Sequence, residues 1–547
     1  MNSLGASRGI LMLSLVPFSL IMTLTGRAEQ PRYWQLTFSY DSNSLSLLEA
    51  RRIPDLRKQV QTPGLRGSAW IVAYKLIWVG TDAREILSTK IEVPIGIRTV
   101  MGETSPCQTI IPSQGIFVVR AEGPVDEDQP KAIRLIKTGT AGFSATSGLS
   151  SLPPAFAILD ITLPITRFSS MASPPPGPIS ATKVRDTGND RNRLVIVVLG
   201  DGYTSANLAA ERFSQDVTNF VSAFGGKSPW DIYFAGTNIY RVDIESRQQG
   251  ADEPPLGIYV DTYLNTSFWA RGIEYLLTLD SVGTQRAIQA ANSLVGVGIW
   301  DHIFVLVNST KYGGSGGTIA VSSVHSAASE IALHEFGHSF AGLADEYETG
   351  GSGLPSTDSE PNVDFHVSGP GLKWLVWVEA GTPLPTPETS QYANVVGAFE
   401  GAKYCPTGIY RPWYDCLMRT LGRTFCPVCK ESHAVRYMQL VDLLDVTTPP
   451  LGSVQHVGPA GVRFAARPIP ITPLSYEWRI GGGVIPGATS YTLTVTPGHL
   501  PSASATLELR VAHPTSLVRR YNISRTYQWL VEGQPTAISP NAWRVYR

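Results

Sequence analysis

Residues 331–347 read IALHEFGHSFAGLADEY, and this stretch carries the strongest local prediction in the chain. The run 327–340 is helical by composition, and Gly342 is placed to end that helix. His334 and His338 are four residues apart, so on a helix they share one face and both imidazoles can reach the same ion. A helix that stops at Gly342 lets the following residues turn back toward that ion.

The sequence therefore predicts a zinc site on this helix. Imidazole binds Zn²⁺ at about 2.0–2.1 Å, and a catalytic zinc needs a third protein ligand and one open position. We predict His334 and His338 as two ligands and Asp345 as the third, with Glu346 competing for that place. Glu335 would act as the general base on a water molecule. Isolated matches to this motif often mark two ordinary histidines on a half-buried helix, so the surrounding sequence must support the site.

Strands and helices alternate along the sequence that leads to this stretch. The apolar run 194–199 is typical of a buried strand, 208–224 has helical periodicity, and 303–307 predicts a second buried strand. Asp201 follows the first run in a Gly-Asp-Gly sequence, which we interpret as a plain turn rather than a ligand site. These patterns predict an α/β catalytic domain over residues 188–445.

The segments on either side of this domain are rich in β-strand signals. Short β-prone runs separated by turn residues predict an N-terminal β-sandwich over residues 29–168. The Pro- and Ser-rich segment 169–187 predicts a stiff linker. Alternating runs beyond a Thr-Thr-Pro-Pro sequence predict an immunoglobulin-like β-sandwich and C-terminal tail over residues 446–547. The expected fold is multidomain, with an α/β domain between two β-sandwiches.

Residues 1–28 have the pattern of a signal peptide. Arg8 precedes a largely apolar run at 10–24, and a short polar stretch leads to Ala28. The run contains Pro17 and is shorter than the ~20 apolar residues of a spanning helix. We predict cleavage near Ala28 and a secreted or periplasmic chain without membrane insertion.

Composition makes nucleic acid a poor candidate partner. The chain has 44 Lys and Arg against 45 Asp and Glu, so its formal net charge of −1 offers no basic field to phosphates. A length of 547 residues exceeds what one core usually holds, which predicts several domains.

Four of the five cysteines lie close together in the sequence: Cys405, Cys416, Cys426 and Cys429. Cys107 stands alone. Because we expect export, we predict structural disulfides among the four, with the pairing open. A zinc ribbon would need a second closely spaced pair beside Cys426 and Cys429, and Cys405 and Cys416 are too far apart to supply it.

With these motifs in place, residues 193–437 resemble the metzincin-clan peptidases typified by the bacterial IgA-specific metalloendopeptidase. The matching stretches occur in order at 199–204, 246–252, 261–263, 312–317, 334–347, 416–418 and 425–429. The resemblance implies a Met-turn in which Met418 supports the metal site from below. It also implies that 318–323 is an exposed edge strand that pairs with an extended substrate.

One spacing departs from the usual metzincin pattern. Gly342 lies four residues and Asp345 seven residues after His338, each one further than the pattern has it. Aspartate keeps the site viable because carboxylate oxygens bind zinc, but the longer loop keeps Glu346 as a competitor. The sequence also offers three tyrosines that could steady an oxyanion and does not choose among them: Tyr347, Tyr404 and Tyr410.

The sequence thus predicts a secreted zinc metalloendopeptidase that hydrolyses peptide bonds of extracellular proteins, with Glu335 as general base. Two other classes stay open. A zinc-bearing adhesin or binding protein without peptidase activity would work through the sandwiches, but it would have no need of Glu335. A metal-dependent hydrolase of a non-peptide bond would use the same water chemistry, and the resemblance favours a protein or peptide substrate over it.

Overall fold

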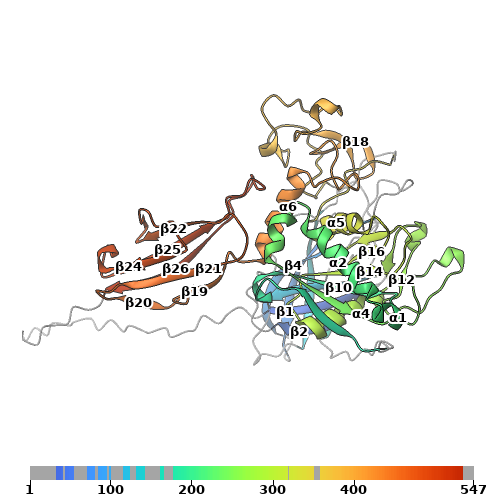
Figure 1. The fold of residues 1–547 in the computed structure, drawn as a ribbon, viewed down its shortest axis with the longest axis horizontal. Helices are drawn as coiled ribbons and strands as arrows, with labels where there is room; N and C mark the ends of the chain where they lie inside the picture. The colour runs from blue at the N-terminus through green and yellow to red at the C-terminus, as the bar shows by residue number, and fades with distance from the viewer. Residues whose placement is uncertain are drawn as a thin grey trace, which may run out of the picture. The chain divides into compact units, whose positions relative to one another are not determined.

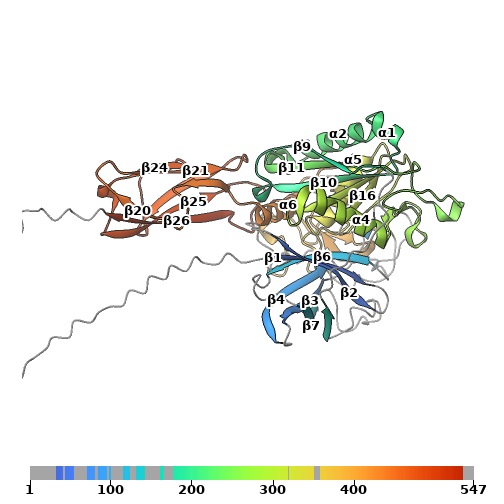
Figure 2. The ribbon, with the colours of Figure 1, turned by 90° about the horizontal axis from the view of Figure 1, so that it is seen from below.

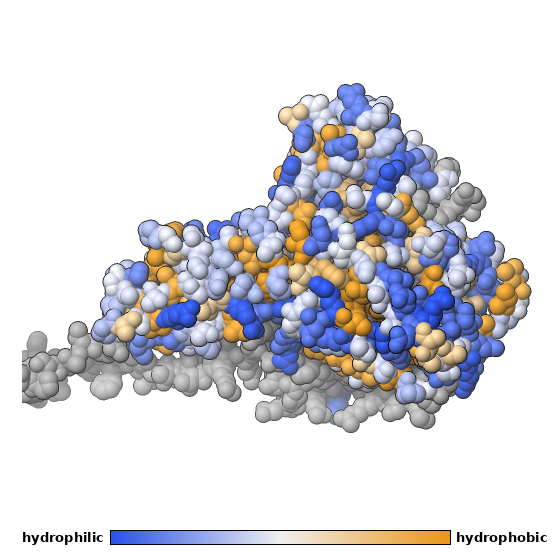
Figure 3. Space-filling model, in the orientation of Figure 1, coloured by the Kyte–Doolittle hydropathy of each residue, from blue (hydrophilic) through white to orange (hydrophobic). Residues whose placement is uncertain are grey.

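The structure is a computed structural model that describes residues 33–40, 44–53, 71–80, 84–94, 98–99, 115–122, 131–141, 160–164, 177–317, 319–349 and 358–533. These residues belong to one unit, Arg32–Arg547. The predicted signal peptide and Cys107 lie outside them. None of the described helices has the length and hydropathy of a membrane span. Figure 3 shows hydrophilic and hydrophobic residues interspersed over the described surface in view.

As predicted, the chain is multidomain and rich in β-sheet, with few helices (Figure 1). In the N-terminal part, two antiparallel sheets enclose one apolar core that includes Leu36, Phe38 and Trp78. The first sheet has the order β2-β1-β6, and the second has the order β4-β3-β7-β8. Their strands are β1 (Tyr33–Tyr40), β2 (Leu45–Ile53), β3 (Ile71–Val79), β4 (Glu85–Pro94), β6 (Gly115–Glu122), β7 (Ala132–Ala141) and β8 (Asp160–Pro164).

A seven-stranded mixed sheet follows, with the order β5-β15-β16-β14-β10-β11-β9. Strands β16, β14, β10 and β11 are parallel to one another, and β9, β15 and β5 are antiparallel to their neighbours. The predicted strands at 194–199 and 303–307 are both present. The strands are β5 (Arg98–Thr99), β9 (Ser180–Arg185), β10 (Leu194–Asp201), β11 (Thr237–Asp243), β14 (His302–Val307), β15 (Gly314–Gly316) and β16 (Ala320–Ser323). Strand β9 lies inside the predicted linker 169–187 and forms one edge of the sheet.

Helices cover both faces of this sheet. Strand β10 is apolar at every position from Leu194 to Leu199, which allows it to be buried on both faces. Its even-numbered residues pack with α2 and α5, and its odd-numbered residues pack with α4 (Figure 2). A strand buried on both faces reads as a continuous apolar run rather than an alternating one. The helices are α1 (Ser205–Ala209), α2 (Arg212–Gly225), α3 (Trp230–Tyr233), α4 (Ser281–Ala291), α5 (Ala328–Ser339) and α6 (Pro427–Leu440). The predicted helix 208–224 is divided between α1 and α2 at Glu211, whose φ is 56°.

The prediction that residues 318–323 form an exposed edge strand is wrong. Strand β16 lies between β14 and β15, and all four of its residues are buried. Its backbone groups are therefore taken by neighbouring strands rather than offered to a substrate. The Gly-rich segment before it forms β15 instead of a free loop, and β15 in turn pairs with β5. A pairing between residues more than two hundred positions apart cannot be read from local sequence.

Asp201, at the end of β10, holds the loop that follows β11. Its carboxylate accepts hydrogen bonds from the Leu264 N–H at 2.8 Å, the Thr266 N–H at 3.2 Å and the Thr266 hydroxyl at 2.6 Å. The Ser246 hydroxyl donates to the same carboxylate at 3.3 Å. Asp201 is fully buried. The Gly-Asp-Gly sequence is thus a structural junction and does more than the plain turn that the sequence suggested.

The C-terminal part contains two further sheets, with the orders β19-β21-β24 and β20-β26-β25-β22-β23. Phe464, Trp478 and Trp529 contact one another, with ring centroids 5.4 to 6.3 Å apart, so both sheets share one aromatic core. The strands are β19 (Leu444–Thr448), β20 (Val454–Val457), β21 (Val462–Pro468), β22 (Ser475–Ile480), β23 (Gly483–Val484), β24 (Thr492–Val495), β25 (Ser504–Ala512) and β26 (Ser524–Gly533). Two short hairpins complete the described strands: β12 (Thr266–Ser267) with β13 (Thr278–Leu279), and β17 (Phe399–Ala402) with β18 (Cys405–Arg411).

The Asp201 junction gives a stability prediction. Asp201→Ala leaves several buried donors without an acceptor, so we expect the free energy of unfolding to fall by roughly 3–5 kcal/mol. Urea unfolding followed by circular dichroism measures the change. Asp261→Ala is the matched control, because Asp261 pairs only at the surface with Arg247 and should cost less than ~1 kcal/mol. Equal midpoints for the two variants would contradict the structural role of Asp201.

Candidate metal centre and active site

Helix α5 carries the His-Glu-x-x-His motif and ends where the sequence predicted. Gly342 has a φ of +66°, and its N–H donates to the carbonyl of His338 at 3.1 Å. The N–H of Leu343 donates to the carbonyl of Gly337 at 3.0 Å. This is a helix end built on a left-handed residue, for which glycine is the favoured choice. The chain beyond Leu343 then returns toward the helix.

The structure brings His334, His338 and Asp345 together. Nε2 of His334 lies 3.0 Å from Oδ1 of Asp345, and Nε2 of His338 lies 3.2 Å from the same oxygen. The two Nε2 atoms are 3.1 Å apart. All three side chains are buried, and they form one of the groups whose ligand atoms are close enough to hold a metal ion.

The hydrogen bonds of the two imidazoles fit a metal at their centre. Nδ1 of His334 lies 3.0 Å from the carbonyl of Leu417, and Nδ1 of His338 lies 2.7 Å from the carbonyl of Leu343. A carbonyl only accepts, so each Nδ1 carries a proton, and in the neutral imidazole each Nε2 then presents a lone pair. Two lone pairs and a carboxylate oxygen repel unless a cation lies between them. Two nitrogens on a tetrahedral zinc would be about 3.3–3.4 Å apart, close to the separation found here.

Asp345 and Glu346 face different groups, which separates the two candidates for third ligand. Burial alone would raise the pKa of Asp345, but positive charge at the imidazoles of His338 and His334 outweighs it and holds that pKa well below its ordinary value. A metal cation bound to neutral imidazoles would act on Asp345 in the same direction. Burial raises the pKa of Glu346 well above its ordinary value. The Glu346 carboxylate accepts from Asn362 Nδ2 at 2.8 Å and lies 3.2 Å from the Cys429 sulfur. In this arrangement Asp345 faces the histidines and Glu346 does not.

Tyr404 orients Asp345. Its hydroxyl donates to Oδ2 of Asp345 at 2.5 Å, leaving Oδ1 directed at the histidines. The backbone supports the same contact, because the Lys403 N–H donates to the Asp345 carbonyl at 3.1 Å and the Tyr404 N–H to the Tyr347 carbonyl at 2.9 Å. Partners of this kind fix the direction of a metal ligand. The sequence offered Tyr404 only as one of three oxyanion candidates, and its link to Asp345 depends on contact across 59 positions.

Glu335 lies on the side of α5 that β15 covers. A Cβ placed on Gly316 would fall 2.5 Å from Oε2 of Glu335, so only glycine lets β15 lie so close to the helix. Tyr312, just before β15, is within electrostatic reach of Glu335. Burial and then the Glu335 charge raise the pKa of Tyr312 to about 12, which keeps its hydroxyl protonated. Sequence reasoning selected the glycines here and missed Tyr312 as a neighbour of Glu335.

Met418 packs under the same helix. A Cβ on Gly337, between the two histidines, would fall 2.6 Å from the Met418 sulfur. Met418 is fully buried, and Leu417 beside it supplies the carbonyl that accepts from His334. The turn predicted at 416–418 therefore lies directly against the histidine motif.

Comparison with known proteins agrees with this arrangement. Residues 182–391 and 388–436 match the family model described as IgA Peptidase M64. This segment is similar to the IgA peptidase M64 family. It spans a little less than half of the chain and includes α5, Asp345, Tyr404 and Met418. The resemblance drawn from the sequence motifs is thereby confirmed.

Other comparisons add little to the M64 assignment. No curated protein matches the chain. Among solved structures, a putative beta-galactosidase from Bacteroides fragilis is similar over 92% of this chain and 72% of its own. It has 8% sequence identity and a TM-score of 0.13, too low to support any argument about fold or function.

The prediction of disulfides among the four clustered cysteines is wrong. Cys416, Cys426 and Cys429 are free thiols, and all three are buried. Cys405 is disulfide-bonded, and its partner lies outside the described residues. Closeness in sequence and an expected oxidising compartment suggested pairing within the cluster, but neither fixes how side chains meet in space.

A third group of ligand-type side chains among the described residues does not fit a metal. Asp358, Asp364 and His366 have ligand atoms close together. The Lys373 ammonium lies 3.4 Å from an Asp358 carboxylate oxygen, and the Lys373 N–H donates to Asp364 at 2.7 Å. A cationic side chain and backbone donors already satisfy these carboxylates.

Tyr404 gives a test of how Asp345 is held. Tyr404→Phe removes the hydrogen bond to Asp345 without removing the ring, so we expect metal affinity to fall roughly 10–100-fold. Competition with a chromogenic chelator measures the change. Tyr410→Phe is the matched control on β18, away from Asp345. Unchanged affinity in the Tyr404 variant would contradict its orienting role.

His433, on α6, gives a pH prediction. Its ring stacks on Phe336 and Phe340, and neither ring nitrogen has a hydrogen-bond partner among the described residues. Burial lowers the pKa of His433 to about 3. Between pH 6.5 and 3 the unfolded chain therefore binds a proton that the folded chain refuses, so stability is lost as pH falls through this range.

His433→Phe should flatten that acid dependence. At about 1.4 kcal/mol per pKa unit, several kcal/mol of the parent's loss should be absent from the variant. Urea unfolding at a series of pH values provides the comparison. His456→Phe, at an exposed histidine, should keep the parent's dependence. Parallel curves for the parent and His433→Phe would show that this histidine is not the group that resists protonation.

Proposed function

We propose that this chain is a zinc-dependent endopeptidase whose metal ligands are His334, His338 and Asp345. The observation that carries the proposal is the convergence of two Nε2 lone pairs and one carboxylate oxygen, within 3.2 Å of each other in a buried place, on a segment of a peptidase family. Three protein ligands leave one position open for water, as catalytic zinc requires.

In this proposal the residues around the metal have separate tasks. A zinc ion bound there would polarise a scissile carbonyl and make a water molecule more acidic. Glu335 takes a proton from the attacking water and delivers it to the leaving amine. Tyr404 holds Asp345, while the carbonyls of Leu417 and Leu343 hold the two imidazoles in the tautomer that exposes Nε2. Tyr312 is within electrostatic reach of Glu335 and keeps its hydroxyl protonated, so it would be available to donate a hydrogen bond to developing charge.

The finer fold and the location belong to the same proposal. A helix with the histidine motif, a glycine stop, a third ligand on the returning chain and Met418 beneath support a metzincin-like catalytic domain. The two C-terminal sheets around Trp478 and Trp529 support an immunoglobulin-like module. The signal-peptide pattern of residues 1–28 and the disulfide at Cys405 support export to an oxidising compartment. Protein or peptide chains outside the cell are then the substrates.

Glu335→Gln tests the mechanism. The amide keeps the size of the side chain but cannot accept a proton as a carboxylate does. We expect kcat/KM on a mixed set of extracellular proteins to fall by about 10²–10⁴ or more while bound zinc stays equal to the parent's. New amino termini, profiled by mass spectrometry, measure cleavage, and elemental analysis measures zinc.

Two controls make the result decisive. Glu330→Gln changes a carboxylate on the first turn of the same helix, where it pairs with Lys227, and should keep cleavage. His334→Ala/His338→Ala should lose both cleavage and the associated zinc. A parent chain that binds zinc at these histidines and cleaves no protein would overturn the peptidase proposal in favour of a metal-bearing binding protein.

A further inference from the structure

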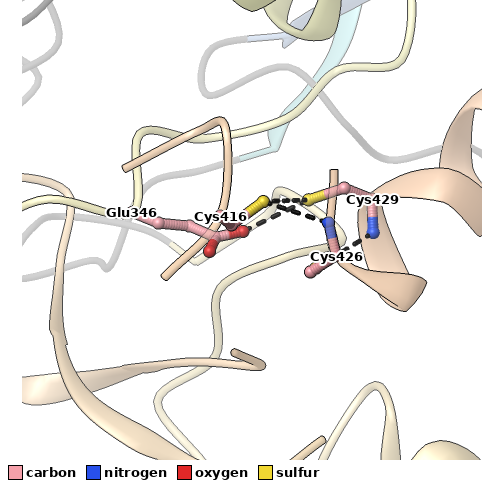
Figure 4. A group of neighbouring side chains, drawn as sticks. All are labelled: Glu346, Cys416, Cys426 and Cys429. Carbon is pink, nitrogen blue, oxygen red and sulfur yellow. Dashed lines mark hydrogen bonds between the residues drawn. The ribbon is translucent and has the colours of Figure 1, made fainter. Parts of the chain in front are cut away.

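Three free thiols and a carboxylate form a second buried cluster next to the histidine centre (Figure 4). Glu346 follows the third ligand of that centre, Cys416 lies two residues before Met418, and Cys426 and Cys429 are at the start of α6. None of the four is more than 2% exposed. Their ligand atoms all lie within 4.8 Å of one another.

The separations in this cluster match a tetrahedral metal site. The sulfurs of Cys416 and Cys429 are 3.8 Å apart, and Oε1 of Glu346 lies 3.2 Å from the Cys429 sulfur. Two sulfurs bound to zinc at about 2.3 Å with a tetrahedral angle lie about 3.8 Å apart. A sulfur and a carboxylate oxygen on the same ion lie about 3.5 Å apart, a few tenths of an ångström from the value found.

Backbone groups around the cluster favour negatively charged sulfur. The N–H of Cys426 donates to the Cys416 sulfur at 3.2 Å, and the N–H of Cys429 donates to the Cys426 sulfur at 3.4 Å. Cys426 is also the N-cap of α6, where the helix dipole stabilises a thiolate. Donors aimed at sulfur stabilise the ligand form of a thiol more than the protonated form.

One oxygen of the Glu346 carboxylate is unsatisfied among the described residues. Its Oε2 is buried and has no hydrogen-bond partner among the described residues. A buried carboxylate with an oxygen left unpaired is costly. The other oxygen of Glu346 lies beside the Cys429 sulfur, and the buried Arg411 guanidinium is within electrostatic reach of the carboxylate. A cation within the cluster would compensate for this charge.

The redox state of the cysteines points the same way. Cys405 is disulfide-bonded, while Cys416, Cys426 and Cys429 remain reduced. Disulfides form in oxidising compartments, where three adjacent thiols would also be exposed to oxidation. Thiolates that are bound to a metal are held apart and kept from pairing.

We propose that Glu346, Cys416, Cys426 and Cys429 bind a structural zinc ion separate from the ion of the histidine centre. Sulfur-rich donor sets of this kind select zinc among the common divalent ions, and binding releases the thiol protons. Four protein ligands fill a tetrahedral zinc completely, so no position is left for water or substrate. The ion therefore fastens the fold and performs no chemistry.

This second ion would position the first. The Glu346 N–H donates to the carbonyl of Met418 at 2.7 Å, and the neighbouring carbonyl of Leu417 holds His334. A metal shared by Glu346, Cys416 and α6 ties the segment that carries Asp345 to the turn beneath the histidines. These four residues are positioning residues for the proposed active site.

Metal stoichiometry tests the proposal without any need for peptidase activity. We expect elemental analysis of the purified full chain to find two zinc ions per molecule. His334→Ala/His338→Ala should retain one, and Cys426→Ser/Cys429→Ser should retain the other. A parent with a single zinc that disappears in the histidine variant, or a cysteine variant that keeps two, would overturn the second site and leave the proposed function intact.

A measurement on the parent chain guards against variants that fail to fold. With metal bound, Cys416, Cys426 and Cys429 should resist alkylation by iodoacetamide, and all three should react after chelation under the same conditions. Replacement with Co²⁺ should produce sulfur-to-metal charge-transfer absorption in the near ultraviolet, which histidine and carboxylate ligands alone do not give. A disulfide between any two of the three in the parent, detected by peptide mapping, would refute the proposal.

Discussion

The geometry of the histidine centre depends on one constraint. Three buried atoms that carry lone pairs lie close together, and they repel one another unless something holds them in place. Two imidazole Nε2 atoms and an oxygen of Asp345 lie within 3.2 Å of one another with almost no exposure to water. Such a group is stable only if a cation occupies its centre or if the surrounding chain holds it firmly. Backbone carbonyls on the Nδ1 atoms and the Tyr404 hydroxyl on the carboxylate provide that hold.

Segments from distant parts of the chain also pack against α5 and fix its position. Strand β15 covers one side, where Gly316 leaves room for Glu335, and Met418 covers another, where Gly337 leaves room for its sulfur. Each contact is possible because glycine has no side chain to occupy the space that the Glu335 carboxylate or the Met418 sulfur fills. The mixed sheet behind them is anchored by β10, whose alternate residues pack with helices on both faces.

The segment from Asp345 to Tyr347 links the two clusters of ligand-type residues. Carbonyl groups of Asp345 and Tyr347 accept from the hairpin residues 403 and 404, while the N–H of Glu346 between them donates to Met418. Backbone groups that alternate in this way belong to an extended chain, whose successive side chains point to opposite sides. Asp345 consequently reaches the histidines and Glu346 reaches the cysteines, so one short segment contributes a carboxylate to each cluster.

The sequence by itself determined the features that depend on local spacing. A separation of four residues places His334 and His338 on one helix face, a left-handed position after that helix requires Gly342, and continuous apolar runs identify β10 and β14 as buried strands. Tertiary structure decided the rest. The surroundings of the adjacent acids Asp345 and Glu346 and the contact of Tyr404 depend on partners 11 to 83 positions away. The burial of β16 depends on β15, which turns back to pair with it and itself pairs with β5 more than two hundred positions away. The free state of three clustered cysteines depends on how their side chains meet in the fold. Helical spacing and chain stiffness act over a few residues, whereas these contacts exist only after the sheets and helices have packed.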